Sequence, residues 1–379
     1  MQTGSYTYPP LEKVIWGISA PERVGLELDR LGAERVFVVA SGTLSKNTSV
    51  IMDLREVVGD RFVGCFDECR EHSPLESVIQ CVQAVRAAQP DWLLTVGGGS
   101  VIDTAKIAQI GLTHGVRDMA GLRAQIGVPS TAPSKVRQIM VPTTLSGSEF
   151  TNGAGSLDRE RKLKVAFAAP DLCARVVILD PAIALHTPEA LWLSTAIRSM
   201  DHAVESYCAD GVNAFIKANT LQAVRLFFES LPRTKQDPTD LEARVASQQA
   251  VWLATCGLFQ VSMGASHGIS YLLGSVGGAP HGYTSCVTLP AVLRWNESAN
   301  ADAQRDLAAA IGAPDKPFWA SLAELLDTLD LPRRISQIGV TEEMIPQIVE
   351  YALQSPVVAG NPRPVKTESD VRDILALAT

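Results

Sequence analysis

The chain has 379 residues, of which 46% are hydrophobic and 20% are charged, with a formal net charge of −8 at pH 7. This length predicts about two globular domains, and an acidic balance without a basic tract disfavours nucleic acids and anionic membranes as partners. No stretch resembles a signal peptide or reaches the roughly 18–20 apolar residues of a membrane helix, and seven scattered cysteines are typical of reduced thiols in a cytoplasmic protein.

Helices and strands alternate through the first half of the chain. Helical periodicity at 22–31, 74–89 and 100–115 alternates with short apolar strands at 35–41, 91–99 and 138–144. Such alternation is typical of βαβ units, whose right-handed crossovers place helices on both faces of a parallel sheet. The last clear strand lies within 164–181, so we predict an α/β domain over residues 1–180.

The second half has helical periodicity almost to its end. Thr187 is a good N-cap with Pro188 at the first helical position of the helix that follows. Further helical patterns occur at 212–231, 239–262, 285–298, 301–311, 317–328, 341–354 and 367–378. We therefore predict an all-helical domain over residues 181–379.

A glycine-rich turn stands at TVGGGSVIDTAK, residues 95–106, where a strand runs into a helix. Ser100 and Asp103 have the spacing of a capping box, and Lys106 adds a cation one turn into the helix. Glycines let the backbone approach a phosphate, and a helix N-terminus offers free amides and partial positive charge. The pattern is neither GxGxxG nor a P-loop, and its alternative interpretation is a tight turn without a ligand.

A second polar loop, VPTTLSGSEFTNGAGS at residues 141–156, follows another predicted strand. Its hydroxyl groups can contact ribose, phosphate or a nicotinamide edge, although such loops are also common for turn chemistry alone. Loops that follow successive parallel strands lie at one edge of the sheet, where ligands bind. Together the two loops predict a nucleotide site.

Three histidines lie in apolar or glycine-rich stretches of the helical half. His202 belongs to AIRSMDHAVESY, and His267 and His281 flank a glycine-rich turn. Three histidines from two or three elements can bind Zn or Fe(II) when they meet. The alternative is that each is an ordinary hydrogen-bonded histidine.

These motifs together resemble the iron-containing (group III) alcohol dehydrogenases, in particular their maleylacetate reductase-like branch. GGGSVIDTAK, PTTLSGSE, the His202-x-x-Glu205 helix, His267 and Pro280-His281-Gly282 occur in that family's order and spacing, and the resemblance runs from about residue 10 to NPRPVKTESDVRDIL. It implies an α/β dinucleotide-binding domain, an all-helical catalytic domain, and an active site in the cleft between them. It also implies hydride transfer between NAD(P)H and an alcohol/carbonyl pair.

The resemblance implies a set of cofactor-binding residues. Gly97, Gly98, Gly99 and Ser100 are expected to hold the pyrophosphate, while Asp103 is expected to anchor that loop and Lys106 to support it. Those expected along the rest of the cofactor are Thr143, Thr144, Leu145, Ser148 and Lys164. Ser41 matches a position where an aspartate selects NAD in some members, so a serine there leaves both NAD and NADP possible.

The resemblance also implies a change at the metal site. Metal-dependent members bind Fe or Zn through one Asp and three His, and the three His positions match His202, His267 and His281. The Asp position is Arg198 here, and a further family His is Tyr271. At about 4 Å and an effective dielectric near 20, a guanidinium costs a cation roughly 4 kcal/mol per unit charge, so a divalent ion is disfavoured. Maleylacetate reductases also depart from the Asp ligand, and we expect a metal-independent site.

Arg198 is then the expected source of positive charge in the site. It can stabilise a developing alkoxide or bind a substrate carboxylate. Its structural alternative is an ion pair with Asp201 or Glu205. The expected general acid is one of His202, His267 and His281, with Tyr271 and Tyr283 as further candidates.

The predicted function is an NAD(P)H-dependent oxidoreductase that interconverts an alcohol and an aldehyde or ketone, with an anionic substrate and no metal. The alternatives are a maleylacetate reductase of aromatic degradation, a dehydroquinate synthase-type lyase or cyclase, and a catalytically altered NAD(P)-binding protein. The expected partners are a small carbonyl or alcohol substrate and a second copy of the chain in a homodimer.

Overall fold

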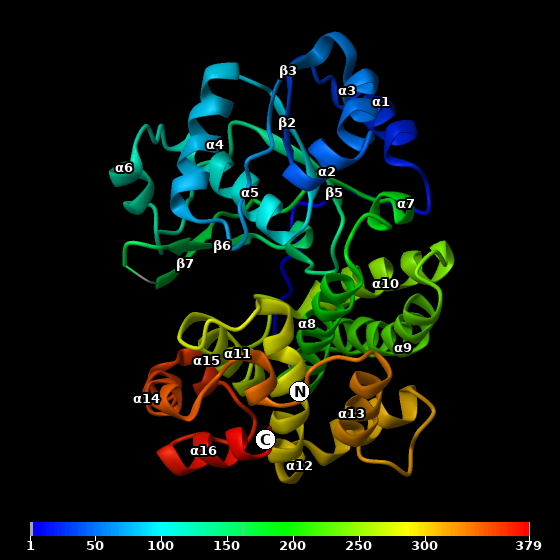
Figure 1. The fold of residues 1–379 in the computed structure, drawn as a ribbon, viewed down its shortest axis with the longest axis vertical. Helices are drawn as coiled ribbons and strands as arrows, with labels where there is room; N and C mark the ends of the chain where they lie inside the picture. The colour runs from blue at the N-terminus through cyan, green and yellow to red at the C-terminus, as the bar shows by residue number, and fades with distance from the viewer. Residues whose placement is uncertain (1–2, 162, 379) are drawn as a thin grey trace. The chain divides into compact units, whose positions relative to one another are not determined.

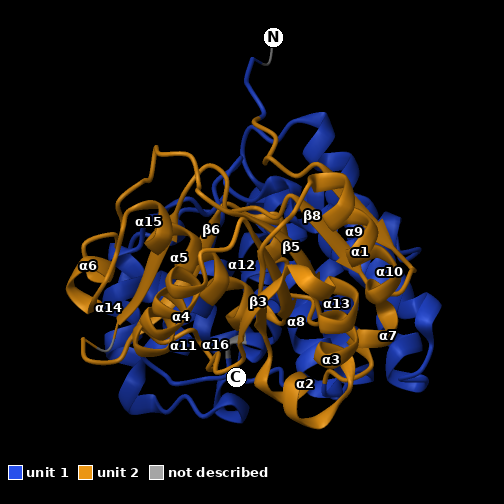
Figure 2. Cartoon of the chain, turned by 90° about the horizontal axis from the view of Figure 1, so that it is seen from above, with its two compact units in different colours: residues 1–6, 188–379 blue, residues 7–187 orange. Residues whose placement is uncertain are grey.

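A computed structural model describes residues 3–161 and 163–378, with the side chain of His281 outside the described part. The chain divides into two compact units, coloured separately in Figure 2. One unit is Thr7–Thr187, and the other joins the segment up to Tyr6 to the chain from Pro188 onward. The hydroxyl of Tyr6 donates to the carbonyl of Cys256 (3.0 Å), which ties the N-terminal segment to the second unit.

The first unit contains a six-stranded parallel sheet. Its strands are β1 (Lys13–Trp16), β2 (Val36–Ala40), β3 (Phe62–Phe66), β4 (Trp92–Gly97), β5 (Arg137–Pro142) and β8 (Val176–Leu179), in the order β1-β8-β5-β4-β2-β3. The predicted parallel sheet is confirmed. Strands β1 and β3 were not predicted, because they are only four and five residues long and carry few fully buried side chains.

Helices cover both faces of this sheet (Figure 1). They are α1 (Ala20–Leu31), α2 (Gly42–Asn47), α3 (Val50–Val58), α4 (Leu75–Ala88), α5 (Gly99–Thr113), α6 (Met119–Arg123) and α7 (Pro181–Ala184), with short 3₁₀ turns η1 (Gly59–Arg61) and η2 (Ser148–Phe150). Alternate residues of β2 enter two separate cores, Phe37 and Val39 beside α4 and α5, and Val36 and Val38 beside α1 and α3. Strands buried on both faces explain the continuous apolar runs of the sequence.

A two-stranded antiparallel hairpin, β6 (Gly153–Asp158) and β7 (Leu163–Ala168), extends from the same unit. It follows the polar loop after β5, and its register pairs Gly153 with Ala168 and Asp158 with Leu163. The hairpin brings Gly155 into hydrogen-bonding contact with Asp103 of α5.

The second unit is helical, as predicted. Its helices are α8 (Glu189–Cys208), α9 (Ala214–Gln236), α10 (Leu241–Ala254), α11 (Ala265–Ser275), α12 (His281–Ala310), α13 (Phe318–Thr328), α14 (Ile345–Gln354), α15 (Pro356–Ala359) and α16 (Glu368–Ala376), with 3₁₀ turns η3 (Thr255–Gly257), η4 (Ile335–Ile338) and η5 (Glu342–Met344). Helix α8 packs against α9, α10, α11 and α12 and is the central helix of this unit (Figure 1). In the described part of the chain, no helix combines the length and apolar character needed to cross a membrane.

Three local predictions in this half were wrong. Helix α8 starts at Glu189 with Pro188 as its N-cap, and the hydroxyl of Thr187 donates instead to the carbonyl of Thr143 (2.6 Å). The patterns at 285–298 and 301–311 belong to one helix, α12, which is kinked at Asn300. Helix α11 was not predicted, because its glycines were interpreted as a turn.

Candidate functional site

The glycine turn connects β4 to α5 at the carboxyl edge of the sheet. Its geometry leaves little room for side chains: a Cβ on Gly98 would lie 2.8 Å from Thr144 Cγ2, and one on Gly99 would lie 2.9 Å from Ser146 Oγ. Gly98 is the N-cap of α5, and no described side chain caps this helix start. The first amides of this 15-residue helix therefore have no side-chain cap among the described residues, and the start of a helix carries partial positive charge.

The predicted capping box between Ser100 and Asp103 was wrong. Ser100 lies inside the first turn of α5, and its hydroxyl oxygen accepts from the backbone N–H of His72 (3.1 Å). Asp103 instead accepts from the hydroxyl of Ser148 (2.5 Å) and from the backbone N–H of Gly155 (3.1 Å). Asp103 thus anchors the second polar loop to the helix that carries the first.

Lys106 lies behind the glycine turn, where it is fully buried. Its ammonium donates to the carbonyls of Ser148, Thr151 (2.7 Å) and Gly153 (3.0 Å). Burial lowers the pKa of Lys106 and raises that of Asp103, and each is the other's main compensating charge. The predicted cation therefore does not project toward a phosphate; it holds the 148–153 loop in place.

Two further predicted cofactor residues, Ser41 and Thr143, follow the parallel strands β2 and β5, which lie on either side of β4. Ser41 follows β2 and donates its backbone N–H to Val96 (2.9 Å), and Thr143 follows β5 and donates to Gly97 (3.0 Å). Chain order reverses between β2 and β4, so these groups lie at the topological switch point where open α/β sheets bind ligands. Leu145 is buried at 1% exposure.

Sequence reasoning missed the loop that follows β3. His72 and Ser73 both have left-handed backbone, with φ of 63° and 46°, which is strained for residues other than glycine. The Ser73 hydroxyl donates to the carbonyl of Ser100 (2.8 Å), so this loop is fixed to the start of α5. Burial, followed by the charge of Lys164 on β7, lowers the pKa of His72. The sequence carried no local signal for this backbone, because a residue before proline, as Ser73 is, normally adopts extended backbone with negative φ.

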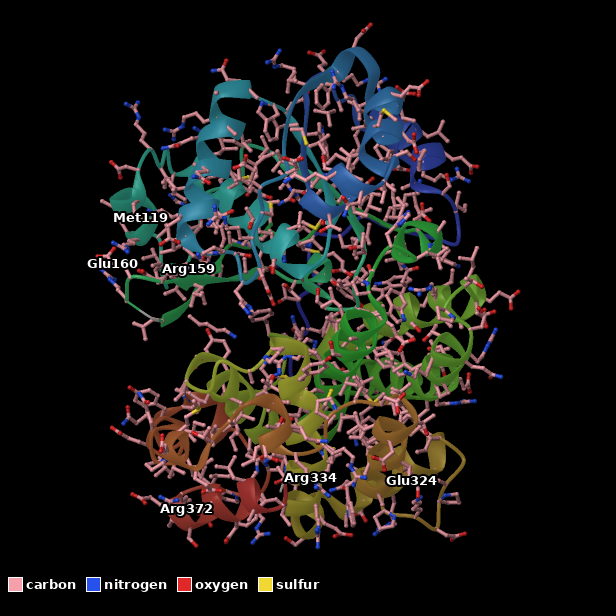
Figure 3. All side chains as sticks on the ribbon, in the orientation of Figure 1. Met119, Arg159, Glu160, Glu324, Arg334 and Arg372 are labelled. Atoms are coloured by element: carbon pink, nitrogen blue, oxygen red, sulfur yellow. The ribbon has the colours of Figure 1, made fainter. Side chains whose placement is uncertain are left out.

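The second group of predicted site residues lies on α8. The helix carries Arg198, followed three, four and seven residues later by Asp201, His202 and Glu205. This spacing puts the four side chains on one buried face of the helix. By contrast, the charged side chains labelled on the helical unit in Figure 3, Glu324, Arg334 and Arg372, are exposed. Charged side chains are seldom fully buried unless they are paired, so this cluster is exceptional in its surroundings.

Arg198 is 6% exposed, and its guanidinium has three partners among the described side chains. Nη1 donates to the Ser285 hydroxyl (2.9 Å) and lies 3.4 Å from Asp201 Oδ2, and Nη2 lies 2.7 Å from Nε2 of His267. The Ser285 hydroxyl in turn donates to Asp201 Oδ2 (2.7 Å). The predicted pairing of Arg198 with Asp201 is therefore present, while Glu205 has other partners.

His267 has a defined protonation state in this arrangement. A guanidinium has donors only, so Nε2 of His267 accepts from Arg198 and the ring proton sits on Nδ1. The ring of His202 lies 5.1 Å from that of His267, centroid to centroid. Burial, followed by the charge of Arg198, lowers the pKa of His202 well below its usual value, so this imidazole is neutral.

Tyr271 lies one turn after His267 on α11, with 37% of its surface exposed. Burial raises the pKa of Tyr271 and the charge of Arg198 partly opposes this, which leaves the pKa at about 12. The hydroxyl therefore carries its proton at neutral pH. His281 is the first residue of α12, and its side chain lies outside the described part. The structure therefore brings together Arg198, His202 and His267 from α8 and α11, and Tyr271 lies four residues after His267 on α11.

These residues do not fit a divalent metal ion. The imidazole nitrogen of His267 that would ligate a cation accepts a hydrogen bond from Arg198, and a guanidinium can neither ligate nor release a proton at neutral pH. Among the described side chains, no three His, Cys, Asp or Glu residues are grouped to hold a metal. The positive charge of this site belongs to Arg198.

Comparison with known proteins identifies the family. The model "Iron-containing alcohol dehydrogenase" matches residues 11–181, and "Fe-containing alcohol dehydrogenase family, C-terminal" matches residues 192–379. Maleylacetate reductase 1 of Cupriavidus pinatubonensis is 28% identical over 94% of this chain and 92% of its own, and Dehydrogenase ALT3 of Alternaria alternata is 31% identical over 91% and 98%. The crystal structure of maleylacetate reductase from Agrobacterium tumefaciens has a TM-score of 0.85 at 27% identity, covering 100% of this chain and 98% of that chain.

Proposed function

Because this chain belongs to the iron-containing alcohol dehydrogenase family, whose members are NAD(P)-dependent oxidoreductases of alcohols and carbonyl compounds, we propose that it reduces an anionic ketone or aldehyde without a metal ion. The observation that carries this proposal is the buried guanidinium of Arg198, held by Ser285, Asp201 and His267. Fixed positive charge at this position performs the electrostatic task of a Lewis acid.

Arg198 is the group that recognises and polarises the substrate in this proposal. The substrate takes over one edge of the guanidinium, so that a carbonyl oxygen or a neighbouring carboxylate accepts from Nη2 in place of His267 Nε2. Arg198 has few water molecules around it to reorganise, because it is buried, and its attraction for developing negative charge is correspondingly strong. Bound NADH or NADPH supplies the hydride.

Tyr271 is the proposed proton donor. His202 is neutral, and His267 presents an accepting nitrogen to Arg198, so neither offers an acidic proton at the guanidinium. The Tyr271 hydroxyl, with a pKa of about 12, is a stronger acid than an alcohol and can protonate the alkoxide oxygen. The proton leaves the Tyr271 oxygen as the hydride reaches the carbonyl carbon, and water then restores the hydroxyl.

The cofactor half of the proposal is supported by the glycine turn and the two loops behind it. Gly98 and Gly99 leave the start of α5 open to a diphosphate, and Asp103 and Lys106 hold the neighbouring loop. The cleft expected from the resemblance, together with the domain limits 1–180 and 181–379, stays a prediction.

The test pairs substrates of equal length with and without a carboxylate. Oxidation of NADH and NADPH is followed with oxo acids and with the matching neutral ketones, for the parent protein and for Arg198→Ala. We expect kcat/KM for the oxo acids to exceed that for the ketones, and Arg198→Ala to abolish the difference. Equal loss on both substrate classes would overturn anion recognition, and unchanged kinetics would overturn the role of Arg198.

Maleylacetate reduction is the second candidate. It is favoured by relatives that bear this name and align over nearly the whole chain. Oxidation of NADH with maleylacetate, at a kcat/KM above that for all other oxo acids, would support it. Tight NAD(P)H binding without turnover on any carbonyl would indicate the altered binding protein, and conversion without net NADH consumption would indicate a lyase or cyclase.

We also propose that the protein is a cytoplasmic homodimer. The family resemblance supports the dimer, and seven cysteines with free thiols support a reducing compartment. Light scattering coupled to size exclusion measures the first property, and fractionation of the source cells measures the second.

A further inference from the structure

Helix α11, which carries His267 and Tyr271, begins without a local cap. Its N-cap residue is Gly264, which has no side chain to accept from the first backbone amides. Helix starts normally satisfy these amides with a Ser, Thr, Asp or Asn at the N-cap, or with water. In this helix four successive amides donate instead to buried side chains from distant parts of the chain.

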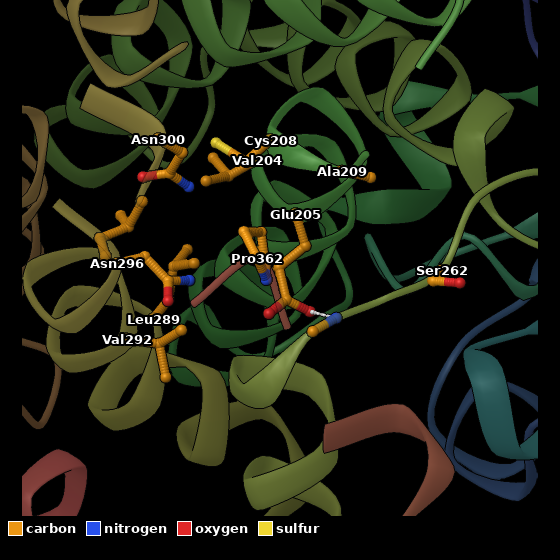
Figure 4. A pocket seen from close by; sticks show the side chains of 12 residues that line it. Val204, Glu205, Cys208, Ala209, Ser262, Leu289, Val292, Asn296, Asn300 and Pro362 are labelled. Atoms are coloured by element: carbon orange, nitrogen blue, oxygen red, sulfur yellow. Dashed lines mark hydrogen bonds between the residues drawn. The ribbon is translucent and has the colours of Figure 1, made fainter. Parts of the chain in front are cut away.

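Glu205 of α8 accepts three of the four hydrogen bonds. Its carboxylate accepts from the backbone N–H groups of Gly264 (3.0 Å), Ser266 (2.9 Å) and His267 (3.2 Å). Figure 4 shows the first of these contacts beside a cavity of about 20 Å³, which is room for about one water molecule. Burial, followed by the charge of Asp201, raises the pKa of Glu205 to about 8, while its three backbone N–H donors lower it; the ionised form also interacts favourably with the positive end of the α11 dipole.

Asn361 accepts the fourth hydrogen bond, from the backbone N–H of Ala265 to its Oδ1 (3.0 Å). The orientation of this amide is fixed, because its Nδ2 donates to Asn296 Oδ1 (2.7 Å) and to the carbonyl of Arg363 (2.7 Å). A Cβ on Gly264 would lie 2.8 Å from Glu205 Oε1 and 2.9 Å from Asn361 Oδ1, so the two acceptors can approach only a glycine.

These caps hold His267, the residue that contacts the proposed catalytic group, Arg198. The last amide bound by Glu205 is that of His267, the residue whose Nε2 meets Arg198. Helix α8 therefore holds His267 at two points, through Glu205 at the backbone and through Arg198 at the ring. A shift at the start of α11 moves His267 and Tyr271 together, because both lie on that helix within one turn.

We propose that Glu205 and Asn361 are positioning residues, which cap α11 from outside and set the orientation of His267 against Arg198. This inference rests on the proposed function only in the role given to Arg198. A purely structural role for the two caps would lower stability without changing the environment of the His267 ring or the chemical step.

The experiment compares Glu205→Gln and Asn361→Ala with Asn213→Ala. Asn213 caps α9 through the backbone N–H of Ile216 (2.9 Å), so its variant loses the same kind of cap away from this cluster. Folding of each variant is checked by circular dichroism and thermal unfolding. The direct measurement is a long-range ¹H–¹⁵N spectrum of protein labelled with ¹⁵N-histidine, in which His267→Asn assigns the His267 ring.

We expect Glu205→Gln and Asn361→Ala to shift the His267 ring nitrogens and to lower kcat by about tenfold or more, since small misplacements of catalytic groups cost up to about a hundredfold. KM for NADH should stay unchanged in both cap variants. In Asn213→Ala the His267 ring signals should also stay unchanged. Unchanged His267 signals in both cap variants would overturn the inference.

The two proposals fail in different measurements. If Arg198→Ala retains full activity, the proposed function is wrong, while the His267 spectrum still decides whether the caps set the ring orientation. If Arg198→Ala is inactive and the spectrum of Glu205→Gln equals that of the parent, the positioning role is wrong and the proposed function stands.

Discussion

Nη2 of Arg198 lies 2.7 Å from Nε2 of His267, so the guanidinium is hydrogen-bonded to the nitrogen that a metal ion would need as a ligand. This single contact sets the tautomer of His267 and directs one edge of the guanidinium toward α11. The other edge is balanced by Ser285 and Asp201. Most of the expected chemistry follows from this pair.

Replacing Arg198 by lysine should lower kcat/KM on anionic carbonyl substrates by about 10²–10³-fold. A lysine keeps the charge but loses the planar fork that reaches Ser285 and His267 at once, and removing one oxyanion donor typically costs this much. Steady-state oxidation of NADH measures the effect. Arg225→Ala, on an exposed face of α9, is the matched control, and a lysine variant within about twofold of the parent would contradict the role of the fork.

Removing divalent metals should leave the activity unchanged. The guanidinium of Arg198 donates a hydrogen bond to His267 Nε2, and this contact excludes a cation from that nitrogen. The measurement is NADH oxidation before and after dialysis against a chelator, with elemental analysis of both samples. Loss of activity that returns on addition of Fe or Zn would show that the guanidinium leaves His267 when metal binds.

Replacing Lys106 by methionine should destabilise the protein and weaken cofactor binding. Three partly buried carbonyls, those of Ser148, Thr151 and Gly153, lose a charged donor, at a cost of up to about 1–3 kcal/mol each. Urea unfolding and titration of NADH fluorescence measure the two effects. Lys46→Met, at an exposed position of α2, is the control, and normal stability with weak NADH binding would instead place Lys106 at the phosphates.

Glu149 should make stability fall as pH rises from about 4.5 to 7. This carboxyl is 1% exposed, and burial raises its pKa from 4.5 to about 7. Between these values the folded state keeps a proton that the unfolded state releases, so the contribution is full below 4.5 and lost above 7.

Glu149→Gln cannot ionise and should escape this loss. Relative to the parent, its free energy of unfolding should improve by about 3 kcal/mol between pH 4.5 and pH 8, given about 1.4 kcal/mol for each pKa unit. Urea unfolding at the two pH values tests the difference. Glu56→Gln, at an exposed carboxyl of α3, should keep the slope of the parent protein; an equal slope in Glu149→Gln would show that Glu149 ionises normally.

Replacing Ser41 by aspartate should make the protein selective for NADH. Ser41 follows β2 at the carboxyl edge of the sheet, and a carboxylate there repels the 2′-phosphate of NADPH. We expect Kd for NADPH to rise by about tenfold or more, since about 1.4 kcal/mol of repulsion suffices, while Kd for NADH changes little. Ser41→Ala removes the hydroxyl without adding charge, and an equal change in both Kd values would contradict the placement of Ser41 at the ribose.

The fold class and the positions of the two loops were predictable because they depend on local pattern. Apolar runs bounded by polar turns predicted the parallel strands around the site, and helical periodicity predicted the second unit. The glycines at 97–99 mark a strand–helix turn by their composition alone. Short strands such as β1 and β3, and the glycine-containing helix α11, have weak patterns and were missed.

The chain by itself determined which chemical groups are present and which face of α8 they share, because helical spacing fixes both. Only the tertiary structure decided their partners. Arg198 meets Ser285 and His267 across 87 and 69 residues, and Glu205 caps a helix whose N-cap residue, Gly264, lies 59 residues later. Lys106 likewise meets carbonyls rather than phosphate. Hydrogen bonds between such distant residues depend on how helices and loops pack, and packing is a property of the whole chain that local spacing does not encode.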